Sequence, residues 1–172
     1  MPPDTTTTAP TAPPPAGPPR RRIRRAAVVE SQRISPHVQR VTVEGPELED
    51  FDPARDGHGG HIKLFLPNAD ERAVTIPTFG PNGPEVPEGA SRPIVRTYTP
   101  RTFDPSANRL AVDFVLHGEG AASEWAARAE PGHEIGVAGP GRGYQPSPDA
   151  THLLLAGDET ALSAIIAIAA AV

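Results

Sequence analysis

Short runs in which apolar residues alternate with others, separated by glycine and proline, constrain the fold of this chain more than any other feature. The clearest runs are residues 38–43 and 110–116. Such alternation is expected when one face of a strand packs on a core and the other meets solvent. The sequence predicts six strands, at residues 25–32, 38–44, 61–66, 94–99, 109–116 and 134–138. Six short strands with turn signals at nearly every junction predict an antiparallel barrel.

Two segments interrupt this strand pattern. Residues 123–130 predict a short helix in which Trp125 covers the barrel, and Pro131 and Gly132 then end the helix. Residues 68–92 are rich in proline and glycine and predict a long loop of variable form.

The pattern changes after Pro148. Residues 152–157 form a continuous apolar run, and residues 158–171 predict a helix rich in alanine and isoleucine. These two elements are typical of the opening of a parallel α/β sheet, whose strands are buried on both faces. Because a parallel strand needs a partner across a crossover, we expect this sequence to be a fragment of a longer chain.

We therefore divide the chain into three parts. Residues 1–22 predict a disordered tail rich in proline, threonine and arginine, because so few apolar side chains cannot offset the entropy of ordering them. Residues 23–146 predict the barrel, and residues 147–172 the start of the α/β domain. The arginine cluster at residues 20–25 is either an electrostatic docking patch or a solvated lead-in to the first strand.

Composition excludes several classes of function. The chain has no cysteine, so disulfides, thiolate nucleophiles and iron–sulfur clusters are excluded, and redox chemistry would need a bound cofactor. The net charge is −5 although residues 1–25 are basic, which argues against nucleic-acid binding by the folded part. The apolar run at residues 161–172 is well short of the ~20 residues that span a membrane. No secretory signal is recognisable, so we expect a cytoplasmic protein. We also expect it to be a monomer.

The first candidate site is Arg96-Thr97-Tyr98-Thr99, at the end of a predicted strand. Arginine offers a planar fork of donors suited to a diphosphate, tyrosine an aromatic face for a flat heterocycle, and threonine a hydroxyl for a ring nitrogen. Strand alternation places Arg96 and Tyr98 on one side. These residues are also ordinary in strands, so a purely structural role remains an alternative.

The second candidate runs from Asp113 to Trp125, a strand that leads through small residues into a helix. Backbone N–H groups at such a helix start can bind phosphate, and glycine or alanine lets the ligand approach. The same letters fit Ser123 as a simple helix N-cap. We expect His117 to line a ligand site in preference to acting as an acid or base.

Two further segments carry weaker signals. Residues 157–162 lie where doubly wound sheets bind ligands, but they lack the spaced glycines of the dinucleotide fingerprint, and Asp158 also fits a plain helix cap. His58 and His61 suggest a metal site, yet no second pair of ligands stands at suitable spacing, so we predict none. No Gly-x-Ser-x-Gly motif supports a hydrolase.

Taken together and in order, these motifs resemble those of the siderophore-interacting protein family, which are FAD-dependent ferric-siderophore reductases related in fold to ferredoxin–NADP reductases. The resemblance covers residues 23–172 and rests on segments 40–48, 61–67, 96–99, 113–125 and 156–162. It implies a six-stranded Greek-key FAD-binding barrel followed by a Rossmann-like domain for NADPH or NADH, and a ferric siderophore as substrate. The family usually has proline where Ala121 and Ser163 stand; neither change removes a side-chain contact.

The resemblance also implies roles for individual residues. Arg96 would hold the FAD diphosphate, Tyr98 would lie against the isoalloxazine or ribityl chain, and Thr99 would reach toward flavin N5. Val115 and His117 would flank the adenine half. The full set of implied cofactor-binding residues is Arg96, Thr97, Tyr98, Thr99, Asp113, Val115, His117, the phosphate-binding backbone of Gly120, Ala121, Ala122 and Ser123, and the start of the NAD(P)H site at Gly157, Asp158, Glu159 and Thr160.

The expected reaction passes electrons from NAD(P)H through FAD to the ferric siderophore, without a catalytic acid or base from the protein. Two rivals remain open. One is a reductase of the same fold that acts on free flavin, a quinone or a ferredoxin. The other is a flavin- or siderophore-binding module without turnover.

Overall fold

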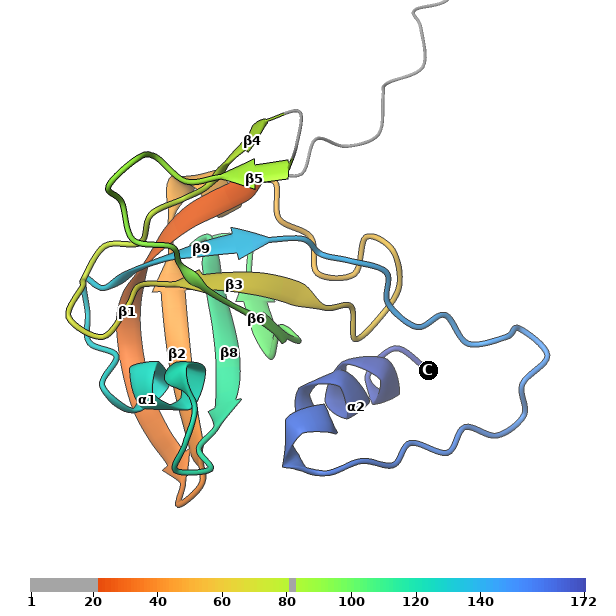
Figure 1. Cartoon of the computed structure of the whole chain (residues 1–172). Helices are drawn as coiled ribbons and strands as arrows, with labels where there is room; N and C mark the ends of the chain where they lie inside the picture. Colours follow the sequence, from red (N-terminus) through yellow and green to blue (C-terminus); the bar gives the residue numbers. More distant parts are fainter. Residues whose placement is uncertain (1–21, 81–82) are drawn as a thin grey trace, which may run out of the picture.

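The computed structural model describes residues 22–80 and 83–172 (Figure 1). The predicted tail therefore lies outside the described residues, apart from Arg22. Seven strands form one sheet in the order β6-β3-β9-β1-β2-β8-β7. Their bounds are β1 Ile23–Ser35, β2 Val38–Glu44, β3 Ile62–Leu66, β6 Ile94–Tyr98, β7 Thr102–Asp104, β8 Arg109–Val115 and β9 Glu134–Ala138.

The six predicted strands are all present, with ends shifted by at most three residues, and every pairing in the sheet is antiparallel. The count of six is wrong, because β7 adds a seventh strand that pairs with residues 109–111 of β8. A strand of three residues is too short for alternation to reveal it.

The two edges of the sheet, β6 and β7, are joined by only three residues, 99–101. The chain thus brings the edges of the curved sheet close together. Because β7 pairs only with the first part of β8, residues 112–115 have no strand partner on that side within the described residues. We call the gap between β6 and residues 112–117 the seam.

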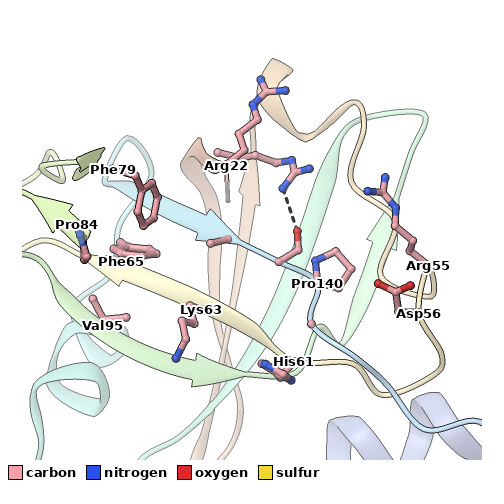
Figure 2. Close-up of a pocket in the computed structure, with 14 residues that line it drawn as sticks. Arg22, Arg55, Asp56, His61, Lys63, Phe65, Phe79, Pro84, Val95 and Pro140 are labelled. Carbon is pink, nitrogen blue, oxygen red and sulfur yellow. Dashed lines mark hydrogen bonds between the residues drawn. The ribbon is translucent and has the colours of Figure 1, made fainter. Parts of the chain in front are cut away.

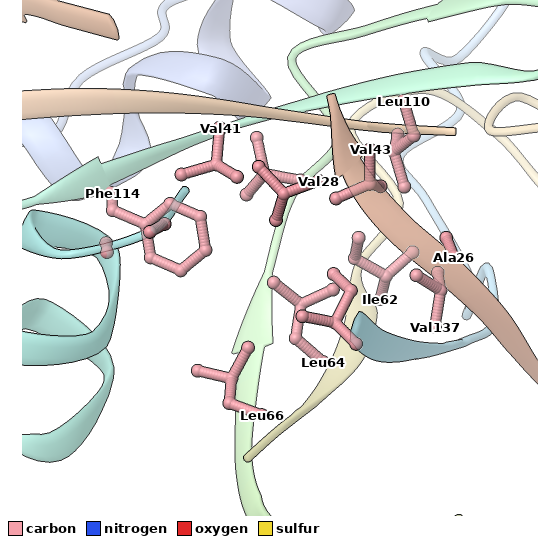
Figure 3. Packing of buried hydrophobic residues seen from close by; sticks show 14 of the residues in the cluster. Ala26, Val28, Val41, Val43, Ile62, Leu64, Leu66, Leu110, Phe114 and Val137 are labelled. Carbon is pink, nitrogen blue, oxygen red and sulfur yellow. The ribbon is translucent and has the colours of Figure 1, made fainter. Parts of the chain in front are cut away.

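The inner face of the curved sheet holds one large hydrophobic core (Figure 3). The side chains of Val41 and Val43 both face the core, as the alternation in the sequence predicts for β2, and both are about 1% exposed. Helix α1 (Ala121–Ala127) closes one end of the barrel and inserts Trp125, which is 1% exposed and packs against Phe114 with 5.6 Å between ring centroids. The prediction that Trp125 covers the barrel is confirmed.

Loop 68–92 covers part of the outer face of the sheet. Val74 is buried there against Ile23 and Phe65, with Ile76 packed beside them. The loop is not wholly irregular, since it contains a hairpin of β4 (Thr78–Gly80) and β5 (Gly83–Glu85), drawn at the top of Figure 1. A short 3-10 turn, η1 (Pro46–Leu48), follows β2.

The predicted strand at residues 152–157 is wrong. The segment forms no strand and lies in an extended loop that swings away from the barrel, and Leu154 is 91% exposed. A strand of a parallel sheet is defined by its neighbour, and no neighbour is present for it among the described residues.

The predicted helix at residues 158–171 is confirmed over most of its length. It begins with a 3-10 turn, η2 (Glu159–Ala161), and continues as α2 (Leu162–Ala169). Helix α2 packs on the loop that precedes β3, because a side chain at Gly59 would lie 3.1 Å from the carbonyl oxygen of Ala164. In the described part of the chain, every helix is too short or too polar to cross a bilayer.

Candidate functional site

A cavity of about 320 Å³ opens at the seam, between β6 and the uncovered end of β8, with the start of the C-terminal helix as its third wall. Its lining residues are Arg96, Thr97, Tyr98, Thr99, Asp113, Val115, His117, Thr160 and Ser163. Eight of these nine were predicted as site residues from the sequence. We call this space the seam cavity.

Arg96 lies on β6, the edge strand at the seam. Its side chain is exposed, and Nη1 donates a hydrogen bond of 2.9 Å to the carbonyl oxygen of Val95. No carboxylate among the described residues lies within ion-pair distance of Arg96. Its guanidinium therefore retains donors and positive charge for an anionic ligand.

Tyr98 and Thr99 form the end of the same wall, and both are half-buried. The Tyr98 ring packs against Phe114 with 4.5 Å between centroids, which fixes its orientation from the core side. Burial raises the pKa of the Tyr98 phenol above its ordinary value, so the ring is neutral at physiological pH. The wall thus combines a rigid aromatic surface with a neighbouring hydroxyl.

Asp113 lines the opposite wall, but its carboxylate already accepts hydrogen bonds from an arginine. It stands directly across the β2–β8 ladder from Arg40, whose Nε and Nη2 donate hydrogen bonds of 2.7 and 2.9 Å to it. Arg101 approaches the same carboxylate to 3.7 Å. The hydrogen bond to Asp113 raises the pKa of Arg40. Two arginines therefore more than offset the negative charge of Asp113 beside the cavity.

His117 marks the far end of this wall, where the chain turns toward α1. It is exposed, and a side chain at Gly120 would lie 3.3 Å from its ring. Gly118 and Gly120 have φ values of 85° and 105°, which favour glycine because other residues are strained there. Gly120, Ala121, Ala122 and Ser123 follow at the start of α1 and do not line the seam cavity.

The interpretation of Ser123 as the N-cap of α1 is wrong. The helix begins two residues earlier than predicted, with Gly120 in the capping position, and the Gly120 carbonyl accepts the Glu124 N–H at 3.0 Å. Ser123 is consequently inside the helix and buried. No side chain caps the first N–H groups of α1.

The third wall comes from η2 and α2. Asp158 caps this turn as expected, since its Oδ1 accepts hydrogen bonds of 2.9 Å from the Thr160 N–H and 2.6 Å from the Thr160 hydroxyl. Thr160 faces the seam, whereas Gly157, Asp158 and Glu159 do not line the cavity. Ser163 joins Thr160 there, and no pattern in the sequence marks Ser163 as a site residue.

A larger pocket, of about 680 Å³, lies on the outer side of the sheet (Figure 2). Phe65, Phe79 and Val95 give it an apolar wall, and Lys63 projects beside them from β3. Arg22 contributes further positive charge, although it also lies within 3.6 to 3.8 Å of Asp50 and Glu47. We call this space the outer pocket; sequence reasoning missed it, because its walls come from distant segments.

The two histidines considered for a metal site, His58 and His61, have different surroundings. The backbone of His58 bridges to Tyr144, and the His61 ring lines the outer pocket next to Gly141. Across the described residues, no three histidine, aspartate or glutamate side chains cluster in a way that could hold a metal ion.

Known proteins with similar sequences point to the same kind of domain. Residues 27–144 match the siderophore-interacting FAD-binding domain. Ferric vibriobactin reductase ViuB of Vibrio cholerae is 36% identical over 141 residues, or 81% of this chain and 51% of ViuB. The NADPH-dependent ferric-chelate reductase of Escherichia coli is 38% identical over 138 residues, or 80% of this chain and 52% of that protein.

The crystal structure of the siderophore-interacting protein SipS from Aeromonas hydrophila superimposes with a TM-score of 0.67 at 37% identity, covering 90% of this chain and 56% of SipS. The chain spans about half the length of the curated relatives it matches. These matches confirm the resemblance found in the sequence, and the chain belongs to the siderophore-interacting FAD-binding domain family.

Proposed function

We propose that this chain is the FAD-binding part of an NAD(P)H-dependent ferric-siderophore reductase, and that the seam cavity holds the flavin. The observation that carries this proposal is the convergence of Arg96, Tyr98 and Thr99 with the uncovered end of β8 in one cavity. The relatives that bear reductase names support the reaction class.

The residues around the seam cavity fit FAD in their chemistry. Arg96 is a cation whose charge no described carboxylate neutralises, which suits the diphosphate. The Tyr98 ring, held from behind by Phe114, offers a flat surface for the isoalloxazine or ribityl chain, and Thr99 offers a hydroxyl near N5. Val115 and His117 would flank the adenine half.

Asp113 acts indirectly in this proposal. Its carboxylate would repel a diphosphate if it were free, but Arg40 and Arg101 hold it and leave the wall positive. We assign Asp113 to fixing these arginines beside the cofactor.

We further propose that the backbone of Gly120 to Ser123 binds phosphate oxygens at the uncapped start of α1, reached from the cavity past His117. Residues 23–146 would then form the FAD domain, and residues 147–172 would begin the NAD(P)H domain. The exposed apolar residues Leu153 and Leu154 support that boundary, since they suit a strand that gains a partner.

A bound FAD would supply two-electron chemistry toward NAD(P)H and one-electron chemistry toward iron. In the overall reaction NAD(P)H would be oxidised to NAD(P)⁺ with release of a proton, and two ferric ions would each be reduced to a ferrous ion, which siderophores hold less tightly. The protein's own part is to bind and orient the cofactor and substrate. Because NAD(P)H is a cytoplasmic reductant, we place the reaction in the cytoplasm.

We propose the outer pocket as the docking site for the ferric siderophore. Val95 of β6 lines the outer pocket, while the next three residues of the same strand line the seam cavity, so one strand separates the two spaces. The combination of Lys63 with apolar side chains suits an anionic chelate that has flat organic arms.

The test of this function uses the electron-transfer half-reaction. The chain is loaded with FAD, reduced by light under anaerobic conditions, and mixed with a ferric siderophore and a ferrous chelator. We expect the oxidised flavin absorbance to recover while the chelate signal appears, with neither change in the flavin-free control. An unchanged flavin spectrum would contradict the proposal, and turnover with a quinone in place of the siderophore would favour the rival reductase.

The Lys63→Glu variant tests the docking site separately. Reversing this charge should raise the apparent dissociation constant for the ferric siderophore by about tenfold or more, because like charges then face each other. Arg33→Ala, at the distant tip of the β1–β2 hairpin, is the control. Equal siderophore affinity in Lys63→Glu and the control would show that the outer pocket does not bind the siderophore.

A further inference from the structure

The wall of the seam cavity that α2 provides carries two hydroxyl groups, and they differ in their hydrogen bonding. The Thr160 hydroxyl donates to Oδ1 of Asp158 at 2.6 Å, so its hydrogen is already used within the turn. The Ser163 hydroxyl enters no side-chain hydrogen bond with any residue that the structure describes. Ser163 is therefore the one donor on this wall that remains for a ligand.

The burial of Ser163 makes this observation informative. Its side chain is in the first turn of α2 and is only 7% exposed, yet it lines the cavity. Because Ser163 lines the cavity, its hydroxyl opens into that space, where water or a ligand can accept its hydrogen bond.

We propose that Ser163 donates a hydrogen bond to a polar ring atom of the flavin and stabilises the reduced form more than the oxidised form. This inference rests on the proposed FAD site. The reduced ring carries more electron density on its acceptor atoms, so a fixed donor strengthens its bond on reduction. The first turn of α2 is then part of the flavin pocket, and Ser163 raises the reduction potential of the bound cofactor.

The experiment compares wild-type chain with Ser163→Ala, Ser163→Thr and Ser147→Ala. The last makes the same chemical change at an exposed turn outside the cavity. FAD affinity is measured from quenching of flavin fluorescence, and the reduction potential by equilibration with a reference dye. We expect Ser163→Ala to bind FAD about three- to tenfold more weakly and to have a more negative potential. Ser163→Thr, which keeps the hydroxyl, should stay close to wild type, as should Ser147→Ala.

Wild-type affinity and potential in Ser163→Ala would overturn the inference. Equal shifts in Ser163→Ala and Ser163→Thr would also overturn it, because the shape of the wall and not the hydroxyl would then be responsible. Failure of the wild-type chain to bind FAD is a different result, which overturns the proposed function itself and this inference with it.

Discussion

Asp113 and Glu44 form the same kind of ion pair, but the surroundings of each pair change how much it contributes to stability. Both carboxylates pair with an arginine directly across the β2–β8 ladder, Asp113 with Arg40 and Glu44 with Arg109. The Asp113 side chain is 13% exposed and is shared with Arg101, whereas Glu44 is 40% exposed. Burial weakens solvent screening and makes a lost partner more costly.

We therefore expect Asp113→Asn to lower the free energy of unfolding by about 1–2 kcal/mol, since it leaves Arg40 and Arg101 without their shared carboxylate. Glu44→Gln should change it far less. Urea denaturation of both variants at pH 7 measures the difference. Equal losses would show that the two pairs are equivalent and that Asp113 has no special place at the seam.

Some residues of the seam cavity could be predicted from the sequence, and others could not. Arg96, Tyr98 and Thr99 were recognisable because each has a side chain suited to one part of a flavin nucleotide. Ser163 was not, because a serine in a helix has no distinctive chemistry until its position in the wall of the seam cavity is known. The occupation of Asp113 by Arg40 likewise depends on the register of two strands, which one sequence does not reveal.

At the scale of elements, β1 is tied to the segment after η1 by a buried arginine. Arg24 is 5% exposed, and its guanidinium donates hydrogen bonds to Asp50 at 2.8 Å and to the carbonyl oxygen of Gly139 at 3.0 Å. The hydrogen bond from Arg24 lowers the pKa of Asp50 below its ordinary value of 3.8.

This pairing predicts a pH dependence of stability. Because the pKa of Asp50 is lower in the folded state, its contribution is present above pH 3.8 and is lost as the pH falls through the folded-state pKa. Asp50→Asn should thus be less stable than wild type at pH 6, and the difference in stability should shrink as the pH falls below 3.8. Thermal unfolding from pH 2 to 6 measures this, and a constant difference across that range would contradict it.

The docking of α2 depends on the close approach of Gly59. This residue has φ +65°, and a Cβ there would lie 3.1 Å from both the Ala164 oxygen and a carbon of Ile168. Gly59→Ala should therefore combine backbone strain with a clash, and α2 should exchange its amide hydrogens faster. Gly89→Ala is the matched control, with φ +78° and nothing within 4 Å. Equal amide exchange of α2 in both variants would show that contact at Gly59 does not hold the helix.

Strands of the barrel were predictable because alternation is local and five or more residues long. β7 was missed because it has three residues, and the strand expected at 152–157 does not form because its apolar run depends on a neighbour that the described residues lack. Helix α1 was found but begins earlier, because Gly120 and not Ser123 takes the capping position.

For the molecule as a whole, the position of the seam cavity depends on the order of the strands. The order β6-β3-β9-β1-β2-β8-β7 places the two edges of the sheet side by side and leaves the seam between them. An edge strand has unpaired backbone groups, and here the gap is lined by side chains suited to a cofactor instead of by another strand. Strand order is not local information, so the sequence predicted most of the residues that line the seam cavity but not the seam that gathers them.

We propose that FAD binds in the seam cavity through Arg96 and Tyr98. This binding is measured by titrating FAD with the wild-type chain, with Arg96→Ala, with Tyr98→Ala and with the loop control Arg92→Ala, followed by flavin fluorescence. We expect saturable binding of one FAD per chain, and affinity about tenfold or more weaker in Arg96→Ala and Tyr98→Ala, because a charged hydrogen bond or a stacked ring is lost. Arg92→Ala should match wild type. Unchanged affinity in both Arg96→Ala and Tyr98→Ala would show that FAD does not bind through these side chains.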